Sequence, residues 1–403
     1  MRAILHSDLN NFYASVECLG HPELASLPVV VGGAQEERHG IVLAKNMVAK
    51  QAGITTGMTL WQAKQICPNL VYFRPNFAKY LDYSRRVKQI YRRFTDQLES
   101  FGIDECWLDV SHSTSLFGSP KEIAEKIRQT VFEETGLTVS IGVSFCKVFA
   151  KLGSDIKKPN AVTEIPYEKF REIVWPLEID AMIGIGRKTK RKLEQIGIKT
   201  LGELANTDKR LLRELFGKNG EWLHDAANGL DNSPVFEDPS VKSVGNSMTY
   251  YRDITNKKDS KALLLLLSES VAARVADENL GLATTVHLFV RESDLFSYSR
   301  QMHIEPSALA IDFLHAAEKL LEPTHDKRKA IRALGVSVSG FVKTKQFSLI
   351  DNNYNKKLNA EVAVEKIRNR FGRLSMHRAL TLCDQKLATL NIKNGHDIDA
   401  SKF

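Results

Sequence analysis

The sequence predicts an α+β protein of several domains, and three observations support this. The chain has 403 residues, which exceeds one ordinary hydrophobic core and favours two to four domains. Strand-like and helix-like patterns alternate through the first half, whereas residues 174–231 read as short basic helices. An aperiodic stretch with two prolines at 232–243 reads as a linker to a second alternating region.

Composition narrows the class of protein. With 43% hydrophobic and 26% charged residues, the chain reads as globular, and its net charge of +8 fits a nucleic-acid partner, although many basic proteins have none. Five cysteines without a CxxC pair indicate a reduced, cytoplasmic protein with neither a zinc site nor a disulfide framework. We expect no secretory signal and no membrane, since the longest aliphatic run, 262–267, is too short to span one.

The first region alternates strands and helices around an acidic segment. We expect a central sheet that carries this acidic strand, with the strand at 138–144 as its partner. The expected strands are 2–8, 28–31, 101–110 and 138–144, and the expected helices begin at 12–17 and run over 44–52 and about 79–99.

Three carboxylates lie in or beside apolar strands. Asp104 and Glu105 are adjacent in one apolar run and Asp8 ends another, which is costly unless a cation or hydrogen bonds compensate them. If the two strands are neighbours, the three carboxylates meet and could hold a pair of divalent cations for phosphoryl or nucleotidyl transfer. The alternative is that Asp8 caps a helix beginning near Asn11 while the other two are solvated at a strand end.

Two further segments could bind phosphate. Residues 10–17 turn from a strand into a helix, so their free backbone amides would face a triphosphate. The basic helix that begins at Lys147 ends in a Lys-Pro turn, which is expected to project Lys158 outward. For any one lysine the alternative is an ordinary solvated surface charge.

A helix-hairpin-helix is predicted at 182–193. Gly184 and Gly186 form its turn, whose amides can hold a DNA backbone phosphate, and Lys188 and Lys190 begin the basic second helix. The alternative is a plain pair of helices without a ligand.

The region after the linker has the order β-α-β-β-α-β, which predicts a separate ferredoxin-like domain. Beyond it, a helix is expected at about 359–371, where Glu365 and Arg368 or Asn369 suggest only a solvated face. The expected elements of the domain are strand 244–251, helix 260–280, strands 284–291 and 297–304, helix 307–321 and strand 331–341.

Taken together, these motifs resemble the Y-family DNA polymerases, which carry out translesion synthesis, and the resemblance runs from residue 1 to about 342. It rests on the segments SDLNNFYASVE, GIDECWLD, CKVFAKLGSDIKKPN, GIGRKTKRKL and VKSVGNSMT, in this order. The family's right-hand architecture implies a ferredoxin-like palm, small fingers, a helix-hairpin-helix thumb and a little finger. The implied domains are palm 1–10 and 77–166, fingers 11–76, thumb 167–231, linker 232–243, little finger 244–342 and a C-terminal tail 343–403.

The resemblance also implies roles for individual residues. Asp8, Asp104 and Glu105, with the carbonyl of Leu9, match the ligands of two Mg²⁺ ions. Asn11, Phe12 and Lys158 match nucleotide contacts, and Tyr13 matches the steric gate that would collide with a ribose 2′-hydroxyl.

The fingers depart from the family pattern. Met47 and Lys50 stand where the family often has Tyr and Arg. Met47 offers no hydrogen-bond donor to a phosphate, and Lys50 provides a point charge in place of a bidentate fork, so we expect Lys50 to retain part of the contact.

The tail contains a possible clamp-binding peptide. Gln346, Phe347, Ser348, Leu349 and Ile350 are similar to the short peptides that dock on the bacterial sliding clamp, although Ile350 replaces the last aromatic residue. The alternative is an ordinary linker.

The expected function is template-directed synthesis of low fidelity: a primer 3′-hydroxyl attacks a dNTP and releases pyrophosphate, in a monomeric cytoplasmic enzyme bound to primer-template DNA. A non-catalytic DNA-binding accessory would not need the three acids. A nucleotide cyclase with a similar palm would leave the helix-hairpin-helix and the ferredoxin-like domain unexplained.

Overall fold

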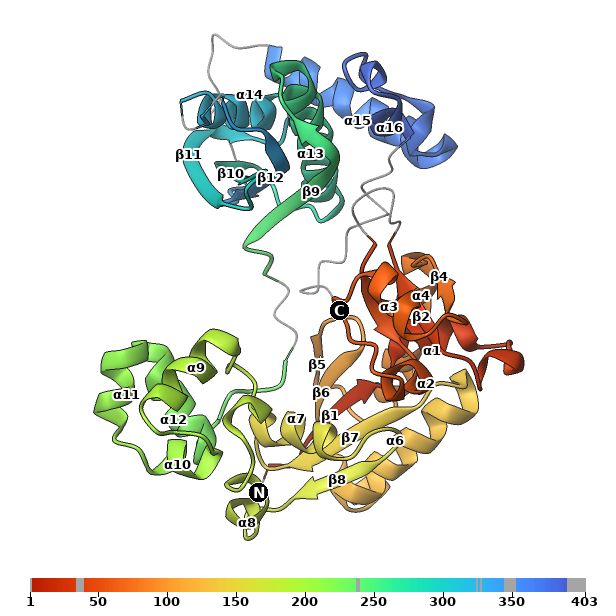
Figure 1. Cartoon of the computed structure of the whole chain (residues 1–403), viewed down its shortest axis with the longest axis vertical. Coiled ribbons are helices and arrows are strands. Elements are labelled where there is room, and N and C mark those ends of the chain that lie inside the picture. The colour runs from red at the N-terminus through yellow and green to blue at the C-terminus, as the bar shows by residue number, and fades with distance from the viewer. Residues whose placement is uncertain are drawn as a thin grey trace. The chain divides into compact units, whose positions relative to one another are not determined.

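The computed structural model describes residues 2–33, 40–236, 240–323, 325–326, 328–343 and 353–389. These fall into two compact units: one holds the palm, fingers and thumb sequences up to residue 236, and the other begins at Ser240 (Figure 1). No helix in the described ranges combines the length and apolarity needed to cross a bilayer.

The first unit is built on a five-stranded sheet with the order β5-β6-β1-β7-β8. β1 lies at its centre and pairs antiparallel with both β6 and β7, so the strand that contains Asp8 and the strand that begins at Glu105 are neighbours, as expected. The prediction that residues 138–144 pair with the acidic strand was wrong, because β1 lies between them. The strands are β1 (Ile4–Leu9), β5 (Leu98–Phe101), β6 (Glu105–Asp109), β7 (Val139–Ser144) and β8 (Val162–Ile165).

Helices cover both faces of this sheet. Leu5 points into the core formed with α4 (Phe77–Tyr91) and α6 (Pro120–Thr135), whereas His6 faces α7 (Lys147–Ile156) through a hydrogen bond to Ser154. This is the alternation expected of a strand that is buried on both sides. The predicted helix 79–99 ends at Tyr91, since the chain then pairs with β6 as the edge strand β5. α1 (Phe12–Cys18) and α5 (Thr114–Phe117) complete this part.

A separate three-stranded sheet with the order β3-β2-β4 forms the fingers. The predicted helix 44–52 begins only at Met47, because Ala44 and Lys45 pair with β2. The Asn46 side chain then caps the helix by accepting the N–H of Ala49 at 2.9 Å. The elements are η1 (Pro22–Leu24), β2 (Val29–Gly32), β3 (Val42–Lys45), α2 (Met47–Gln51), α3 (Leu60–Ile66) and β4 (Val71–Phe73).

The thumb is a cluster of short helices that shares a hydrophobic core with α7. Leu193, Leu204, Leu212 and Leu223 pack in this core with Phe149 of α7, so the thumb is anchored to the palm through apolar contacts. Its elements are α8 (Phe170–Val174), η3 (Ile179–Ala181), α9 (Arg187–Gln195), α10 (Leu201–Asn206), α11 (Lys209–Phe216) and α12 (Lys218–Ala227).

The second unit has the expected β-α-β-β-α-β order. Its four strands form an antiparallel sheet with the order β11-β10-β12-β9, and both helices contribute to one core with it. The elements are β9 (Ser243–Ile254), α13 (Lys257–Asp277), β10 (Ala283–Glu292), β11 (Ser297–Ser307), α14 (Ala310–Leu321) and β12 (Ile331–Ser339).

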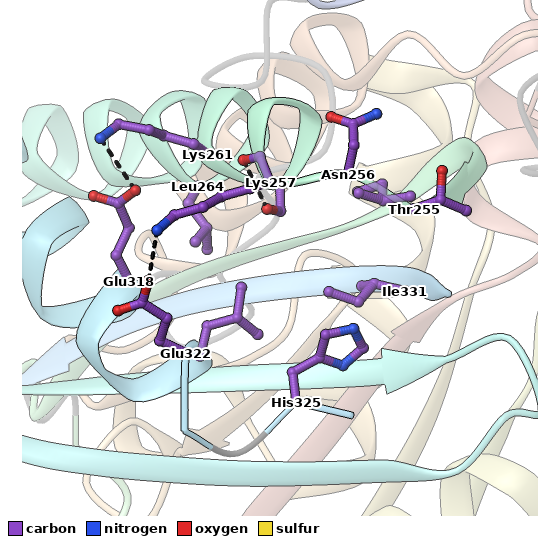
Figure 2. A pocket seen from close by; sticks show the side chains of 12 residues that line it. Thr255, Asn256, Lys257, Lys261, Leu264, Glu318, Glu322, His325 and Ile331 are labelled. Carbon is purple, nitrogen blue, oxygen red and sulfur yellow. Dashed lines mark hydrogen bonds and ion pairs between the residues drawn. The ribbon is translucent and has the colours of Figure 1, made fainter. Parts of the chain in front are cut away.

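An open cavity of about 240 Å³ lies between the start of α13 and the end of α14 (Figure 2). Two ion pairs link the helices there: Lys257 with Glu322 at 2.5 Å and Lys261 with Glu318 at 3.1 Å. Because each lysine is paired with a carboxylate, the cavity has no excess charge to attract an ionic ligand.

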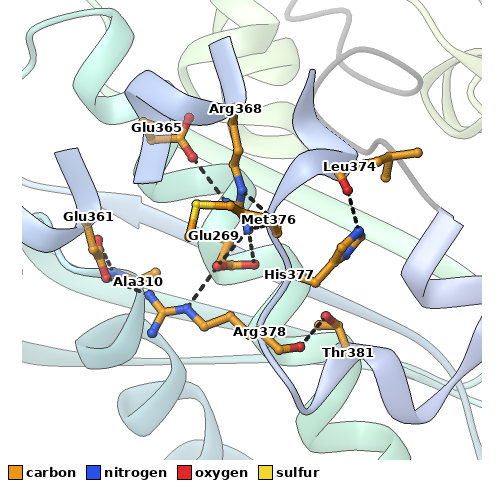
Figure 3. A network of polar contacts seen from close by, with 10 residues as sticks. All are labelled: Glu269, Ala310, Glu361, Glu365, Arg368, Leu374, Met376, His377, Arg378 and Thr381. Atoms are coloured by element: carbon orange, nitrogen blue, oxygen red, sulfur yellow. Dashed lines mark hydrogen bonds and ion pairs between the residues drawn. The ribbon is translucent and has the colours of Figure 1, made fainter. Parts of the chain in front are cut away.

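A C-terminal helical segment packs against α13 in the same unit. The buried carboxylate of Glu269 accepts hydrogen bonds from Arg368 at 3.3 Å and from Arg378 at 3.0 Å (Figure 3). The Tyr250 hydroxyl donates to Asp384. The expected solvated face at Arg368 is therefore wrong, since this residue is 7% exposed. The elements are α15 (Asn353–Phe371), η4 (Arg373–Ser375), η5 (Thr381–Cys383) and α16 (Gln385–Thr389). The possible clamp peptide, residues 346–350, lies outside the described residues.

Candidate active site

The three carboxylates come together at the end of β1. Asp8 and Glu105 are direct partners in the β1-β6 register, and their side chains leave the same face of the sheet. Asp104 lies in the turn between β5 and β6, where its carbonyl accepts the N–H of Leu9 at 3.1 Å. Because Asp104 is in a turn and not within the strand, it does not follow the alternation that would direct neighbouring side chains to opposite faces.

Helix α4 holds this turn from the other side. The hydroxyl of Ser84 donates to the carbonyl of Ile103, and the Lys88 ammonium donates to the carbonyl of Gly102 at 3.4 Å. Ile103 is buried in the palm core, which anchors the turn further. The acidic pair therefore has a rigid support.

The site carries more negative charge than its surroundings stabilise. Burial, together with the nearby charges of Asp8 and Glu105, raises the pKa of Asp104 to about 6. Burial also raises the pKa of Asp8, although the Lys158 ammonium 2.7 Å from its Oδ2 opposes this shift. An added cation would relieve both carboxylates.

Glu105 is held in its ionised form by two neighbours. Burial acts to raise its pKa, but the hydrogen bond from His6 at 3.1 Å and the Lys151 ammonium at 2.5 Å outweigh burial and lower the pKa to about 2. Burial also lowers the pKa of His6, so we take the imidazole as neutral. Its Nε2 lies 3.1 Å from Glu105, and its Nδ1 lies 2.8 Å from the Ser154 hydroxyl, which also donates to the carbonyl of Lys151 at 2.7 Å.

The donor set fits a hard divalent cation in its chemistry, because carboxylate oxygens and a carbonyl are the ligands that Mg²⁺ prefers. Among the described residues, however, no group of three or more His, Cys, Asp or Glu side chains is arranged to hold a metal as it stands. The ammonium groups of Lys158 and Lys151 contact Asp8 and Glu105 instead. The two lysine ammonium groups thus supply positive charge at the carboxylates in this structure.

A cavity of about 240 Å³ opens beside the acids, between palm and fingers. The residues that line it are Asp8, Leu9, Asn11, Phe12, Tyr13, Leu43, Ala44, Lys45, Thr56 and Asp104. The Tyr13 ring stacks on Tyr80 with centroids 4.5 Å apart, and the Tyr80 hydroxyl donates to Glu17 at 2.6 Å. Burial and the charge of Asp104 raise the pKa of Tyr13 to about 12, so its hydroxyl is neutral.

Lys158 turns inward, unlike the outward projection expected from the sequence. Its ammonium contacts Asp8 and Asp155, each at 2.7 Å. Asn10 fixes the loop that carries it, because its Oδ1 accepts the N–H of Asn160 at 2.8 Å while its Nδ2 donates to Ser140 at 2.9 Å. The sequence indicated the lysine but did not single out Asn10 as the residue that holds its loop.

The fingers contribute a lysine that sequence reasoning missed. Lys50 is exposed on α2 and is not among the residues that line the cavity, whereas Lys45 of β3 lines it. Lys45 was overlooked because residues 44–52 were read as one helix. The short apolar run Ile41-Val42-Leu43 before it, which begins with two β-branched residues, was the signal that could have identified a strand here.

The thumb turn requires glycine at one position, and the helix that follows it has no side-chain cap. Gly184 has a φ of +90°, and a Cβ there would lie 2.6 Å from the Trp222 ring, so glycine is required. Gly186 caps α9 and leaves its first amides free. Lys188 is exposed, whereas Lys190 is paired with Glu178 and Asp180 at 2.9 and 2.8 Å.

Comparison with known proteins agrees with this geometry. Residues 7–155 match the impB/mucB/samB family, residues 241–349 its C-terminal domain, and residues 181–231 the thumb domain of DNA polymerase-iota. The chain is 44% identical to DNA polymerase IV of Acetivibrio thermocellus over 96% of this chain and 99% of that protein. It is 36% identical to DNA polymerase IV of Clostridium kluyveri, over 92% and 96% of the two chains.

Solved structures show the same architecture. A Y-family polymerase chimera of Dbh and Dpo4 superimposes with a TM-score of 0.75 at 24% identity, over 85% of this chain and all of that one. DinB from Sulfolobus solfataricus does so with a TM-score of 0.58 at 25% identity, over 85% and 100%. The fold and the matches define a DNA-directed DNA polymerase. The chain belongs to the Y-family, the impB/mucB/samB group, and is a translesion DNA polymerase.

Proposed function

We propose that Asp8, Asp104 and Glu105, with the carbonyl of Leu9, bind two Mg²⁺ ions and direct nucleotidyl transfer from a dNTP to a primer 3′-hydroxyl. The observation that carries this proposal is the meeting of the three acids, which leaves Asp104 with a pKa of about 6. When bound, such ions lower the pKa of an attacking hydroxyl and neutralise charge on the reacting phosphate.

The chain's own residues would supply orientation. His6 and Lys151 keep Glu105 ionised and aimed at the site, and the hairpin turn presents Asp104 beside it. The Lys158 ammonium can move from Asp8 to a triphosphate oxygen, because its loop is fixed by Asn10 and not by Lys158 itself. Catalysis would then rest mainly on positioning and electrostatics.

The cavity is proposed to hold the incoming dNTP. Asn11 and Phe12 line it, and Lys158 would contact the triphosphate from the palm. Lys50 does not line the cavity and would contribute its charge from outside it. Tyr13 would act as the steric gate, since its ring is clamped by Tyr80 and would meet a 2′-hydroxyl. One solved structural relative is an insertion ternary complex of Dbh DNA polymerase, which supports primer-template DNA and nucleotide as substrates here.

The thumb hairpin would grip the DNA backbone. Gly184 and Gly186 leave turn amides available, and the exposed Lys188 adds positive charge at the start of α9. Lys190 would contribute only by leaving Glu178 and Asp180, with which it is paired. These contacts carry no sequence information, so binding should be salt-sensitive and tolerant of sequence.

Primer extension with Asp104→Asn tests the two-metal assignment. We expect this variant to lose Mg²⁺-dependent extension by about a thousandfold or more while retaining affinity for primer-template DNA. Asp82→Asn, which changes an exposed carboxylate on α4, is the matched control and should extend normally. Extension by Asp104→Asn at a rate close to that of the control would refute the assignment.

The proposal also covers the protein's partner, its oligomeric state and its cellular location. Residues 346–350 would dock on the sliding clamp, so their deletion should abolish clamp-stimulated synthesis and leave basal synthesis unchanged. Equal stimulation of the deleted form would refute this.

We also propose a monomer, since one chain supplies all three acids, and a cytoplasmic enzyme, since all five cysteines are free thiols.

The proposed domain division is palm 1–10 and 77–166, fingers 11–76, thumb 167–231, linker 232–243, little finger 244–342 and tail 343–403. The separate sheets of palm, fingers and second unit support it.

A further inference from the structure

Lys45 is the last residue of β3, on the fingers side of the cavity that the acids face. The cavity is lined by Lys45 and Thr56 on one side and by Asp8, Tyr13 and Asp104 on the other. The Lys45 ammonium donates to the Thr56 hydroxyl at 3.1 Å, which leaves two of its three N–H donors for another partner.

The surroundings of Lys45 favour an anionic partner. Its hydrogen bond goes to a neutral hydroxyl, so no charge is neutralised by that contact. Burial and the nearby Lys50 both lower the pKa of Lys45. A phosphate group between the ammonium groups of Lys45 and Lys50 would offset their repulsion and provide a negative partner for Lys45.

We propose that Lys45 binds the triphosphate of the incoming dNTP, as the phosphate contact that the fingers provide from a strand. This inference rests on the proposed function of the cavity. It accounts for Met47, because a thioether on α2 has no donor to offer a phosphate, and a lysine on β3 can replace the lost contact. Lys158 would approach the same triphosphate from the palm.

Two other partners for Lys45 give different results in the same test. A contact with the base of the nucleotide would make the effect of its removal differ among the four dNTPs. A contact with the template strand would weaken DNA binding before any nucleotide is present. A phosphate contact is shared by all four dNTPs and by inorganic tripolyphosphate.

The experiment uses the full-length enzyme and three variants: Lys45→Met, Lys45→Arg and Lys64→Met. Lys64 is an exposed lysine on α3 of the fingers and does not line the cavity. Lys64→Met is therefore the matched control, because this substitution removes the same charge at a site away from the cavity. For each protein, KM and kcat are measured with each dNTP, together with inhibition by tripolyphosphate and the affinity for primer-template DNA.

We expect Lys45→Met to raise the KM for all four dNTPs by about tenfold to a hundredfold, the loss of one charge-assisted hydrogen bond. Inhibition by tripolyphosphate should weaken by a similar factor, whereas kcat and DNA affinity change by less than about threefold. Lys45→Arg should restore most of the affinity, because it keeps the charge and the donors.

The inference is overturned if Lys45→Met behaves like Lys64→Met, if only one or two dNTPs are affected, or if DNA affinity falls without nucleotide. If Lys45→Met does not fold, Lys45→Gln, which keeps a polar side chain, gives the same comparison. Extension by Asp104→Asn would refute the proposed function instead, so the two failures are distinguishable.

Discussion

Asp104→Asn should make the metal-free enzyme more stable while removing its activity. The folded protein holds the Asp104 carboxylate in a partly buried place next to Asp8 and Glu105, which raises its pKa from 3.8 to about 6. An amide has nearly the same shape and no charge, so the substitution removes the repulsion and keeps the packing.

The sign and size of the effect follow from linkage. Because the folded pKa is raised, the folded state binds a proton more tightly than the unfolded state does. The ionised carboxylate therefore destabilises the fold fully above about pH 6, and the penalty disappears below about pH 3.8. A rise of the Asp104 pKa from 3.8 to about 6 corresponds to about 3 kcal/mol, which screening at a partly exposed site reduces to about 2 kcal/mol.

Unfolding of the palm is measured by equilibrating the enzyme in urea and EDTA at pH 7.5 and pulse-labelling with deuterium. Peptides from β1 and β6 report the palm alone, which matters because the chain has two compact units. We expect Asp104→Asn to be about 2 kcal/mol more stable than wild type and Asp82→Asn to be unchanged. Mg²⁺ should stabilise wild type and have much less effect on Asp104→Asn. A variant no more stable than wild type in EDTA would show that the carboxylate is not destabilised by its neighbours.

Three other substitutions test separate parts of the molecule. Tyr13→Ala should raise incorporation of ribonucleotides by at least about tenfold, and unchanged discrimination in primer extension with rNTPs would remove Tyr13 from the gate role. His6→Leu removes the hydrogen-bond donor that orients Glu105, so the affinity for Mg²⁺ should fall by about tenfold, measured by calorimetry and by the Mg²⁺ concentration for half-maximal extension. An unchanged affinity would contradict the positioning role of His6. Arg368→Met breaks a buried contact to Glu269 and should destabilise the second unit by about 3 kcal/mol in urea unfolding. The control Arg370→Met changes an exposed arginine and should leave the stability unchanged. Equal stability of the two variants would mean that this contact does not hold the C-terminal segment.

Local sequence patterns located the acids because their chemistry is unusual in apolar strands. Asp8, Asp104 and Glu105 could be found from residue type and spacing, and the order of the motifs identified the family. The β-α-β-β-α-β order of the second unit was readable for a similar reason, since alternation of period 2 distinguishes its strands from its helices.

Errors arose where pairing between distant strands overrode the local pattern. Residues 44–45 and 98–99 read as parts of helices, but each completes a sheet edge by pairing with β2 or β6. Backbone hydrogen bonds to a neighbouring strand outweigh helix propensity, which differs by only a few tenths of a kcal/mol among most residues. The same error concealed Lys45.

The sequence by itself determined the residue types of the active site and the family, and it predicted more than one domain. The tertiary structure decided which of these residues meet: Asp8 lies opposite Glu105, Lys158 turns inward to Asp8, and Arg368 is buried on Glu269. It also brought Lys45 to the cavity and left Lys50 exposed. The physical reason is that a side chain's charge and shape are local properties, whereas its burial and its partners depend on strands and helices that are far apart in the chain.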